Sequence, residues 1–380
     1  MRLTLVLPGL RGGGAERVLS SLANAWAERG HVVTFLTFDS EGSVAFALSS
    51  AIKFQPLPLL WASGSLLAGL ISNVRRLRIL RAAIRESNPD VVVSFVTCSN
   101  VLSIVASAGL HVPVIVSERS DPLHFETGLV WRLLCTFTYP NAGAVVCLTE
   151  DSEAICRGFA AGKTLIIPNP VAFREQSIRI RTGDKSKQIF AMGRLDPVKG
   201  FDLLLEAFHL IAPRHPDWSL TILGEGSERE HLEGLIADSG LTGRVSLPGW
   251  VADPFPLLAG ADLFVLSSRV EGFPNALCEA MACGIPAVAF NCHSGPADIV
   301  RHEVDGLLVP PQDVHALAAS MERVMSSPTE RARLGRRASE IVQRFGFEEI
   351  LHRWNELFQQ VCPAEKELRK HDSRGPRNDY

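Results

Sequence analysis

Short apolar runs and longer amphipathic segments alternate along the whole chain. In the first half, the apolar runs cover residues 3–7, 32–38, 91–95, 112–117 and 144–149. In the second half, they cover residues 189–193, 219–224, 245–249, 263–268 and 286–290. Runs that are apolar throughout are typical of strands buried on both faces of a parallel sheet, with helices as the connections. Two such series predict an α/β protein with two doubly wound, Rossmann-like parallel-sheet domains.

The polar stretch at residues 173–187 separates the two series and is expected to be a linker. We therefore expect an N-terminal domain over residues 1–172 and a C-terminal domain over residues 188–346. The hydrophobic spacing of residues 347–361 predicts an amphipathic helix, and the charged residues 362–380 predict a disordered tail. A chain of 380 residues suits two domains of ordinary size.

Composition narrows the function classes. The hydrophobic share of 46% and the charged share of 21% are ordinary for a globular protein, and the net charge of −3 gives no reason to expect a nucleic-acid partner. The eight cysteines show neither CxxC pairs nor zinc-ligand spacing, which favours reduced thiols in the cytoplasm. Residues 1–10 are expected to form a strand rather than a signal peptide. The longest nearly apolar run, at about residues 57–71, is shorter than the roughly 20 residues of a spanning helix.

Three loops that follow apolar runs carry candidate chemistry, because ligands of open parallel sheets bind beyond the carboxyl ends of the strands. The first is RGGGAERV, residues 11–18, in which Gly13 and Gly14 allow a ligand to approach the backbone at a helix N-terminus. A tight strand-to-helix turn would use the same glycines. The loop is not GxGxxG, which disfavours a dinucleotide-dependent dehydrogenase.

The second loop, residues 193–208, holds two cations, Arg194 and Lys199. Such cations stabilise the charge that grows on a diphosphate leaving group. The alternative is that both are solvated loop charges.

The third loop, within residues 267–288, leads into a helix and holds Glu271 and Glu279. A carboxylate accepts hydrogen bonds from the vicinal hydroxyls of a sugar or ribose, and the helix N-terminus near Pro274 favours an anion. The spacing of the two glutamates does not by itself exclude that both are exposed charges.

Several segments in one order carry a family resemblance. They are GGGAERV, PNPV, GRLDPVKG, LGEGSERE, PGWV, EGFPNALCEAMACGIPAVA and DGLLVPPQD. Together they resemble the retaining glycosyltransferases of family 4, also called group 1, and in particular the branch that acts on lipid-linked, capsular or exopolysaccharide glycans. The resemblance implies the GT-B architecture, with two Rossmann-like domains, an interdomain cleft and a last helix that crosses back to the first domain.

The resemblance also implies residue roles. Glu271 would meet the donor sugar, Glu279 would hold the ribose, and Arg194 and Lys199 would hold the diphosphate. The remaining nucleotide-binding candidates are Gly13, Gly14, Gly224, Glu225, Gly226, Trp250, Val251, Gly272, Phe273, Pro274 and Asn275.

The expected activity is retaining transfer of a hexose or N-acetylhexosamine from a UDP-sugar, without a cofactor. The sequence has no Asp-x-Asp triplet, so the resemblance implies a metal-independent reaction in which cationic side chains supply the charge. Alternatives are an enzyme of the same fold that uses GDP-mannose, an epimerase or phosphorylase, and a catalytically silent sugar-nucleotide-binding module.

One departure from the family concerns a histidine that many members carry near the reacting carbon. This chain has SERSDP, residues 117–122, at that place. Glu118, Asp121 and His124 are the candidates to replace it, and the sequence does not choose among them. For each, an ordinary loop residue or helix cap is the alternative.

An arginine stripe bears on the acceptor. Arg75, Arg78, Arg81 and Arg85 recur at helical spacing after an apolar segment that contains Trp61. We expect this helix to lie at the inner face of the membrane and to hold the diphosphate of a polyprenyl-linked acceptor. The alternative is a crossover helix whose arginines are solvated.

Overall fold

The computed structural model describes residues 1–10, 13–39, 45–59, 66–119, 129–171 and 187–362. Two compact units are present. The first comprises Met1–Leu148, Ser152–Ile167 and the described chain from Leu351 onward, and the second comprises Thr149–Asp151 and Pro168–Ile350. The predicted linker apart from Lys187, and the predicted tail apart from Cys362, lie outside the described residues.

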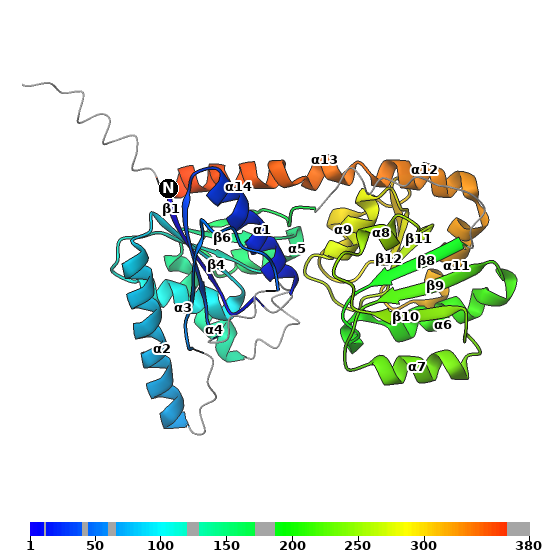
Figure 1. The fold of residues 1–380 in the computed structure, drawn as a ribbon, viewed down its shortest axis with the longest axis horizontal. Helices are drawn as coiled ribbons and strands as arrows, with labels where there is room; N and C mark the ends of the chain where they lie inside the picture. The colour runs from blue at the N-terminus through cyan, green and yellow to red at the C-terminus, as the bar shows by residue number, and fades with distance from the viewer. Residues whose placement is uncertain (11–12, 40–44, 60–65, 120–128, 172–186, 363–380) are drawn as a thin grey trace, which may run out of the picture. The chain divides into compact units, whose positions relative to one another are not determined.

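The described residues of the first unit form a seven-stranded parallel sheet in the order β3-β2-β1-β4-β5-β6-β7 (Figure 1). The strands are β1 (Arg2–Leu7), β2 (Val32–Thr37), β3 (Lys53–Pro56), β4 (Val91–Phe95), β5 (Val114–Ser117), β6 (Ala144–Cys147) and β7 (Thr164–Ile166). The helices are α1 (Gly14–Glu28), α2 (Leu66–Ser87), α3 (Thr97–Ser107), α4 (Leu129–Thr138), η1 (Tyr139–Asn141), α5 (Glu150–Arg157) and, from Leu351 onward, α14 (Phe347–Val361).

The described residues of the second unit form a six-stranded parallel sheet in the order β10-β9-β8-β11-β12-β13. The strands are β8 (Lys187–Met192), β9 (Trp218–Leu223), β10 (Val245–Gly249), β11 (Leu263–Leu266), β12 (Ala287–Phe290) and β13 (Gly306–Val309). The helices are η3 (Pro197–Lys199), α6 (Phe201–Ile211), η4 (Ala212–Arg214), α7 (Arg229–Asp238), α8 (Phe255–Leu258), α9 (Asn275–Ala282), α10 (Pro296–Ile299), α11 (Val314–Ser326), α12 (Pro328–Ala338) and α13 (Ile341–Phe345).

The predicted fold class is confirmed, because every predicted apolar run contains a parallel strand. The apolar-run analysis did not predict β3, β7 and β13, which are all edge strands. An edge strand is covered less completely than a central one, so it needs no continuous apolar run. The sequence KFQP of β3 and the three residues of β7 show this directly, since none of their side chains is fully buried. The strand β13 is nevertheless apolar and largely buried, as GLLV, so incomplete cover explains only β3 and β7.

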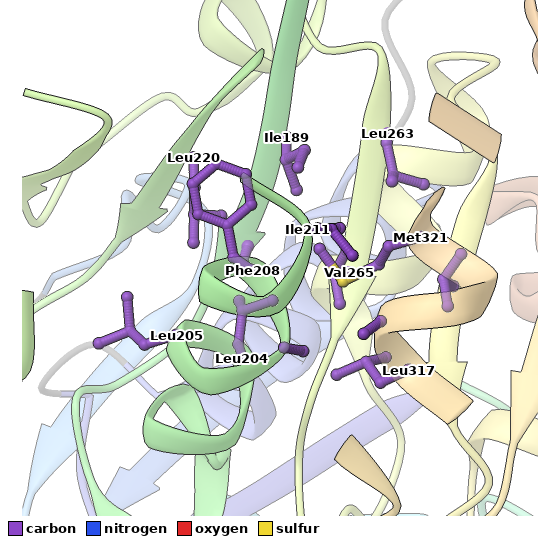
Figure 2. Packing of buried hydrophobic residues seen from close by; sticks show 14 of the residues in the cluster. Ile189, Leu204, Leu205, Phe208, Ile211, Leu220, Leu263, Val265, Leu317 and Met321 are labelled. Carbon is purple, nitrogen blue, oxygen red and sulfur yellow. The ribbon is translucent and has the colours of Figure 1, made fainter. Parts of the chain in front are cut away.

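The core of the second unit forms where alternate strand residues meet two helices. Ile189, Leu220 and Val265 point from the sheet toward Phe208 of α6 and Met321 of α11 (Figure 2). Side chains alternate between the faces of a strand, so one set of alternate positions builds this layer.

The core of the first unit includes the last helix. Trp354 of α14 packs edge-on against Trp26 of α1, with ring centroids 6.0 Å apart, and also lies beside Phe95 and Phe358. All four aromatic side chains are fully buried. The chain from Leu351 onward therefore belongs to the hydrophobic core of the first unit.

Each sheet has one point where the strand order reverses, between β1 and β4 in the first unit and between β8 and β11 in the second. Loops that leave neighbouring strands in opposite directions leave a crevice at such a point, and this is where ligands of doubly wound sheets bind. In the second unit, the two loops that leave this point carry Arg194, Lys199 and Glu271.

Candidate functional site

The loop after β8 is a short, capped turn. The Asp196 carboxylate accepts a hydrogen bond from the Lys199 backbone N–H and so caps the η3 turn. The same carboxylate lies 2.6 Å from Nε of Arg194, whose side chain is 71% exposed. Gly200 follows with φ of +61°, and a Cβ atom there would lie 2.1 Å from the Ser267 carbonyl oxygen. Only glycine therefore lets this loop approach the end of β11.

Lys199 and Glu271 form an ion pair across the two loops of the switch point. Lys199 Nζ lies 2.6 Å from Glu271 Oε1, and the Ser268 hydroxyl donates to the same oxygen at 2.6 Å. Ser267 donates its hydroxyl to the Lys199 carbonyl at 3.0 Å. The Glu271 side chain is only 7% exposed, so its charge lies in a largely dehydrated place where its partners matter most. The structure thus brings together two side chains that are 72 positions apart in sequence.

The two glycines of the LGEGSERE segment allow the loops after β8 and β9 to pack closely. Gly224 has φ of +146°, and a Cβ atom there would lie 1.8 Å from the Gly193 carbonyl oxygen. A Cβ atom on Gly226 would lie 2.1 Å from the Leu195 carbonyl oxygen. The loops after β8 and β9 therefore pack backbone against backbone, which no other residue type permits.

The predicted base-flanking residues lie in the loops after β9 and β10. The Glu225 carboxylate is 2.6 Å from the guanidinium of Arg229, so it already has a partner within its own loop and helix. Trp250 is 70% exposed and follows Gly249, beside which one Glu225 oxygen lies. Val251 comes next in this loop and is partly buried. A large, exposed aromatic ring in a loop that follows a strand suits stacking on a planar ligand.

The turn from β11 into α9 contains Gly272, Phe273 and Pro274, and Asn275 is the first residue of the helix. The Asn275 side-chain oxygen accepts a hydrogen bond from Asn169 of the PNPV segment at 2.9 Å. This contact gives the PNPV segment a structural task, since it anchors the N-terminal end of α9.

Glu279 lies inside α9 and is only 2% exposed, so it is not the exposed helix charge that its spacing allowed. A carboxylate is rarely buried to this extent without a functional or structural partner. Cys292 is also buried near this site, and burial together with the Glu271 charge raises its thiol pKa to about 12. The thiol is therefore neutral, which disfavours a nucleophilic role.

In the first unit, Gly13 and Gly14 stand at the exposed N-terminus of α1. The Gly13 backbone N–H donates to the Glu16 carboxylate at 2.9 Å, so a side chain of the helix already closes this turn. Arg11 and Gly12, which precede it, lie outside the described residues.

The structure gives Glu118 a different environment from the one expected of a catalytic replacement for the histidine. Its carboxylate is buried and accepts hydrogen bonds from Thr97 at 2.8 Å, from Asn100 at 3.2 Å and from the Tyr139 hydroxyl. Burial raises the pKa of this carboxyl. These contacts lie inside the first unit and are those of a structural acceptor. The other two candidates, Asp121 and His124, lie outside the described residues.

The arginine stripe lies on α2 as its spacing predicted, but its members differ. Arg78, Arg81 and Arg85 line an open groove of about 550 Å³ together with Ala82 and Glu86, and Arg75 is also exposed. The Arg81 guanidinium donates to the carbonyl oxygens of Ala106 at 2.8 Å and of Ala108 at 2.6 Å, and so caps the C-terminal end of α3. Arg81 therefore has a structural task of its own, and the joint binding of a diphosphate by the four arginines stays a prediction.

The opposite face of α2 packs on the sheet through Leu80, Ala83 and Ile84, which makes it a crossover helix as well. Trp61 lies outside the described residues. None of the helices in the described part of the chain is both long and apolar enough to cross a bilayer.

Sequence reasoning did not single out Ser267, Ser268 or Gly200. Two hydroxyls at the carboxyl end of the apolar run LFVLSS were a usable signal, because polar residues there face the ligand edge of a parallel sheet. Nothing in the sequence shows that Gly200 must meet the Ser267 carbonyl, since that contact depends on the packing of two loops.

Comparison with known proteins gives the family. Residues 173–341 match the family model of glycosyl transferases group 1, and residues 13–170 match that of the glycosyl transferase 4-like domain. A Campylobacter jejuni α-1,4-N-acetyl-D-galactosaminyltransferase, named for the acceptor GalNAc-GalNAc-diNAcBac-PP-undecaprenol, is 28% identical over 96% of this chain and 100% of its own.

The fold also matches solved structures. Sucrose-phosphate synthase from Thermosynechococcus elongatus superposes with a TM-score of 0.82 at 22% identity, over 95% of this chain and 99% of its own. Anabaena HepE in complex with UDP and glucose superposes with a TM-score of 0.74 at 22% identity, over 94% and 98%. The two matched models meet at residues 170–173, where the predicted linker begins, and the group 1 model includes that linker. The solved neighbours share the two-unit parallel-sheet fold. The chain belongs to the group 1 glycosyltransferases, has the GT-B fold, and is a glycosyltransferase.

Proposed function

We propose that this enzyme transfers a hexose or N-acetylhexosamine from a UDP-sugar to a lipid-linked glycan, with retention of configuration and without a metal ion. The observation that carries the proposal is the Lys199–Glu271 ion pair at the switch point of the second sheet. It places a cation and a carboxylate together at the sheet edge where a sugar nucleotide would bind. The sequence also has no Asp-x-Asp triplet for a bridging metal.

In this proposal, Lys199 and Glu271 both contact the donor once the donor has bound. Lys199 and the exposed Arg194 meet the diphosphate, and their charge stabilises the negative charge that develops as the sugar leaves. Glu271 turns its carboxylate to the sugar hydroxyls, while Ser268 keeps it in place. The bond between the sugar and the diphosphate breaks, and the acceptor hydroxyl attacks the oxocarbenium-like centre from the same face. The hydroxyl proton goes to the departing diphosphate oxygen.

Glu279 takes the ribose in this proposal, and the exposed ring of Trp250 stacks on the base. HepE, which shares the fold, was solved with UDP and glucose, and this supports a UDP-sugar donor. No cofactor other than the donor is expected.

For the acceptor, we propose a glycan on a polyprenyl diphosphate at the inner face of the membrane. The Campylobacter jejuni relative is named for an undecaprenol-diphosphate-linked acceptor, and a Salmonella typhimurium relative, 26% identical over 64% of this chain, is a lipopolysaccharide 1,6-galactosyltransferase. In this chain, Arg78 and Arg85 line the open groove on α2, where two guanidinium groups suit a diphosphate.

A donor screen tests the proposal. The purified protein is incubated with UDP-glucose, UDP-galactose, UDP-N-acetylglucosamine, UDP-N-acetylgalactosamine and GDP-mannose, with and without excess EDTA, and free nucleotide is measured. We expect slow hydrolysis of a UDP-sugar that survives EDTA, and an α-linked product when acceptor is supplied. Preference for GDP-mannose would overturn the donor assignment. Loss of activity on chelation, restored by manganese, would overturn metal independence.

A further inference from the structure

The η3 turn, which carries Lys199, is held by the loop after β11. Each of its three backbone carbonyls accepts a hydrogen bond from that loop. The Pro197 carbonyl accepts from Nη1 of Arg269 at 2.6 Å, and the Val198 carbonyl accepts from the Arg269 backbone N–H at 2.8 Å. The Lys199 carbonyl accepts from the Ser267 hydroxyl at 3.0 Å. Arg269 therefore supplies two of the three contacts.

The Arg269 side chain also reaches the helix that follows the turn. Its Nη1 and Nη2 atoms lie 2.8 Å and 2.6 Å from the two carboxylate oxygens of Asp202, in the first turn of α6. The two side chains are 29% and 35% exposed. Two parallel bonds between a guanidinium and a carboxylate fix the direction of the contact as well as its length. We call the contacts of Arg269 with Pro197, Val198 and Asp202 the Arg269 bridge.

The η3 turn needs such contacts because it is too short to hold its own place. A three-residue turn makes few internal hydrogen bonds and lacks the cooperativity of a long helix. The Asp196 cap lies within the same loop, so it does not fix the distance to β11. Arg269 stands two positions before Glu271, and its partner Asp202 stands three positions after Lys199. The Arg269 bridge therefore joins the two loops close to both members of the ion pair.

The charge balance of the bridge favours positioning over a direct part in the reaction. Asp202 neutralises Arg269, so the two side chains together offer little net charge to a diphosphate. The placement of Lys199 against Glu271, by contrast, sets how well each group meets the donor. A displacement of about 1 Å in such a site can slow a reaction about a hundredfold.

We propose that Arg269 is a positioning residue that acts through Lys199 and Glu271. It holds the turn that carries the lysine against the loop that carries the glutamate, and Asp202 keeps its guanidinium in that orientation. The inference deepens the proposed function and rests on it, because it takes Lys199 and Glu271 as the groups that contact the donor.

Turnover in two backgrounds tests the bridge. In the wild-type background, Arg269→Gln should lower kcat at saturating donor at least about tenfold. In the Lys199→Met/Glu271→Gln background it should lower kcat less than about twofold, because the groups that it positions are already gone. Asp202→Asn breaks the bridge from its other end and should show the same pattern. Equal slowing in both backgrounds would overturn the proposal, since a smaller folded fraction slows both alike.

Two further variants separate position from charge and from stability. Arg269→Lys keeps the charge but loses the planar fork, so its kcat should stay at least about fivefold below that of the wild type. Wild-type turnover of this variant would overturn the proposal, because charge alone would then suffice. Arg214, just after α6, makes a similar two-bonded pair with Glu322, at 2.6 Å and 2.9 Å. Arg214→Gln is the matched control and should leave kcat unchanged; slowing as large as that of Arg269→Gln would also overturn the proposal.

A measurement without turnover distinguishes failure of the bridge from failure of the proposed function. Hydrogen exchange of the β11 and α9 amides gives the coupling between Lys199→Met and Glu271→Gln as a ratio of exchange rates. In the Arg269→Gln background, we expect this ratio to fall at least about fivefold. An unchanged ratio would overturn the proposal, whichever nucleotide sugar is the donor. A lower ratio in a protein that hydrolyses no nucleotide sugar would contradict the proposed function and leave the positioning of the pair by Arg269 standing.

Discussion

Replacement of Lys199 by methionine removes one charge from the centre of the candidate site and leaves the side-chain stem. The stem matters, because Cγ and Cδ of Lys199 lie against Gly193, at 3.4 Å from where a Cβ atom would stand. The change leaves the Glu271 carboxylate, which is only 7% exposed, with the Ser268 hydroxyl and without its cation. A buried carboxylate without its cation lowers the stability of the folded state more than an exposed cation without its carboxylate.

The expected cost follows from these contacts. Loss of one partner from a buried pair costs about 3–5 kcal/mol. Lys199 is 25% exposed, so water takes up part of that loss, and the retained Ser268 hydrogen bond keeps about 1 kcal/mol. We therefore expect Lys199→Met to destabilise the second unit by about 2–3 kcal/mol. Glu271→Gln should cost less, because the lysine that remains reaches water.

A double-mutant cycle isolates the pair. Lys199→Met/Glu271→Gln leaves no buried charge, so its stability should recover most of the loss, with a coupling energy of about 1.5–3 kcal/mol. Hydrogen exchange of the β11 and α9 amides measures this cycle in the second unit alone. The matched control is Lys187 and Asp217, which lie 2.6 Å apart but are 36% and 53% exposed. Their coupling should not exceed about 0.5 kcal/mol.

Turnover separates catalysis from stability. Each single variant should transfer sugar about ten- to a hundredfold more slowly at saturating donor, and the double variant should stay slow although it is stable. A coupling energy as small as that of the control would refute the electrostatic argument. A double variant that recovers both stability and turnover would show that the pair is only structural.

Three further predictions concern the other candidate residues. Glu279→Ala should weaken UDP binding in calorimetry roughly tenfold or more, whereas Glu271→Gln should leave UDP affinity nearly unchanged; equal losses would contradict the division of roles. Arg78→Glu/Arg85→Glu should slow transfer to a lipid-linked acceptor and leave donor hydrolysis unchanged. If the variant transfers sugar as fast as the wild type, both arginines are only solvated charges. The third prediction concerns Glu118→Gln, whose side chain is neutral at every pH. Folding raises the pKa of Glu118 in the wild type. The wild-type protein therefore has its full stability below the unfolded pKa of about 4.3 and loses stability as pH rises through the folded pKa. The free energy of unfolding in urea should therefore rise for the variant relative to the wild type from pH 4 to pH 8. A difference that stays constant with pH would show that folding does not raise the pKa of this carboxyl.

The central strands were predictable because burial on both faces leaves a continuous apolar run, as in VVVSF of β4. The last helix was predictable to the residue over 347–361, because its apolar spacing has the helical period. The edge strand β3 was not, since KFQP contains a single large apolar residue and pairs on one side only.

The sequence predicted which loops carry the candidate site residues, but it did not predict the burial or the hydrogen-bond partners of their side chains. Arg194, Lys199 and Glu271 follow strands, so the rule for parallel sheets places them at one edge. The burial of Glu118 and the use of Arg81 by α3 depend on contacts with residues 21 and 25 positions away, and no local pattern reports such contacts.

The rigidity of the site has a backbone origin. Gly200 brings the loop after β8 against the end of β11, and Gly224 brings the loop after β9 against Gly193. Three strand ends are thus joined by contacts that leave no room for a Cβ atom. Charges held on such a platform do not need to reorganise when negative charge develops on a leaving group, and electrostatic stabilisation is strongest in that situation. A glycine-to-alanine change at either position would therefore displace Lys199 from Glu271 without touching either side chain, so these glycines are part of the proposed electrostatics.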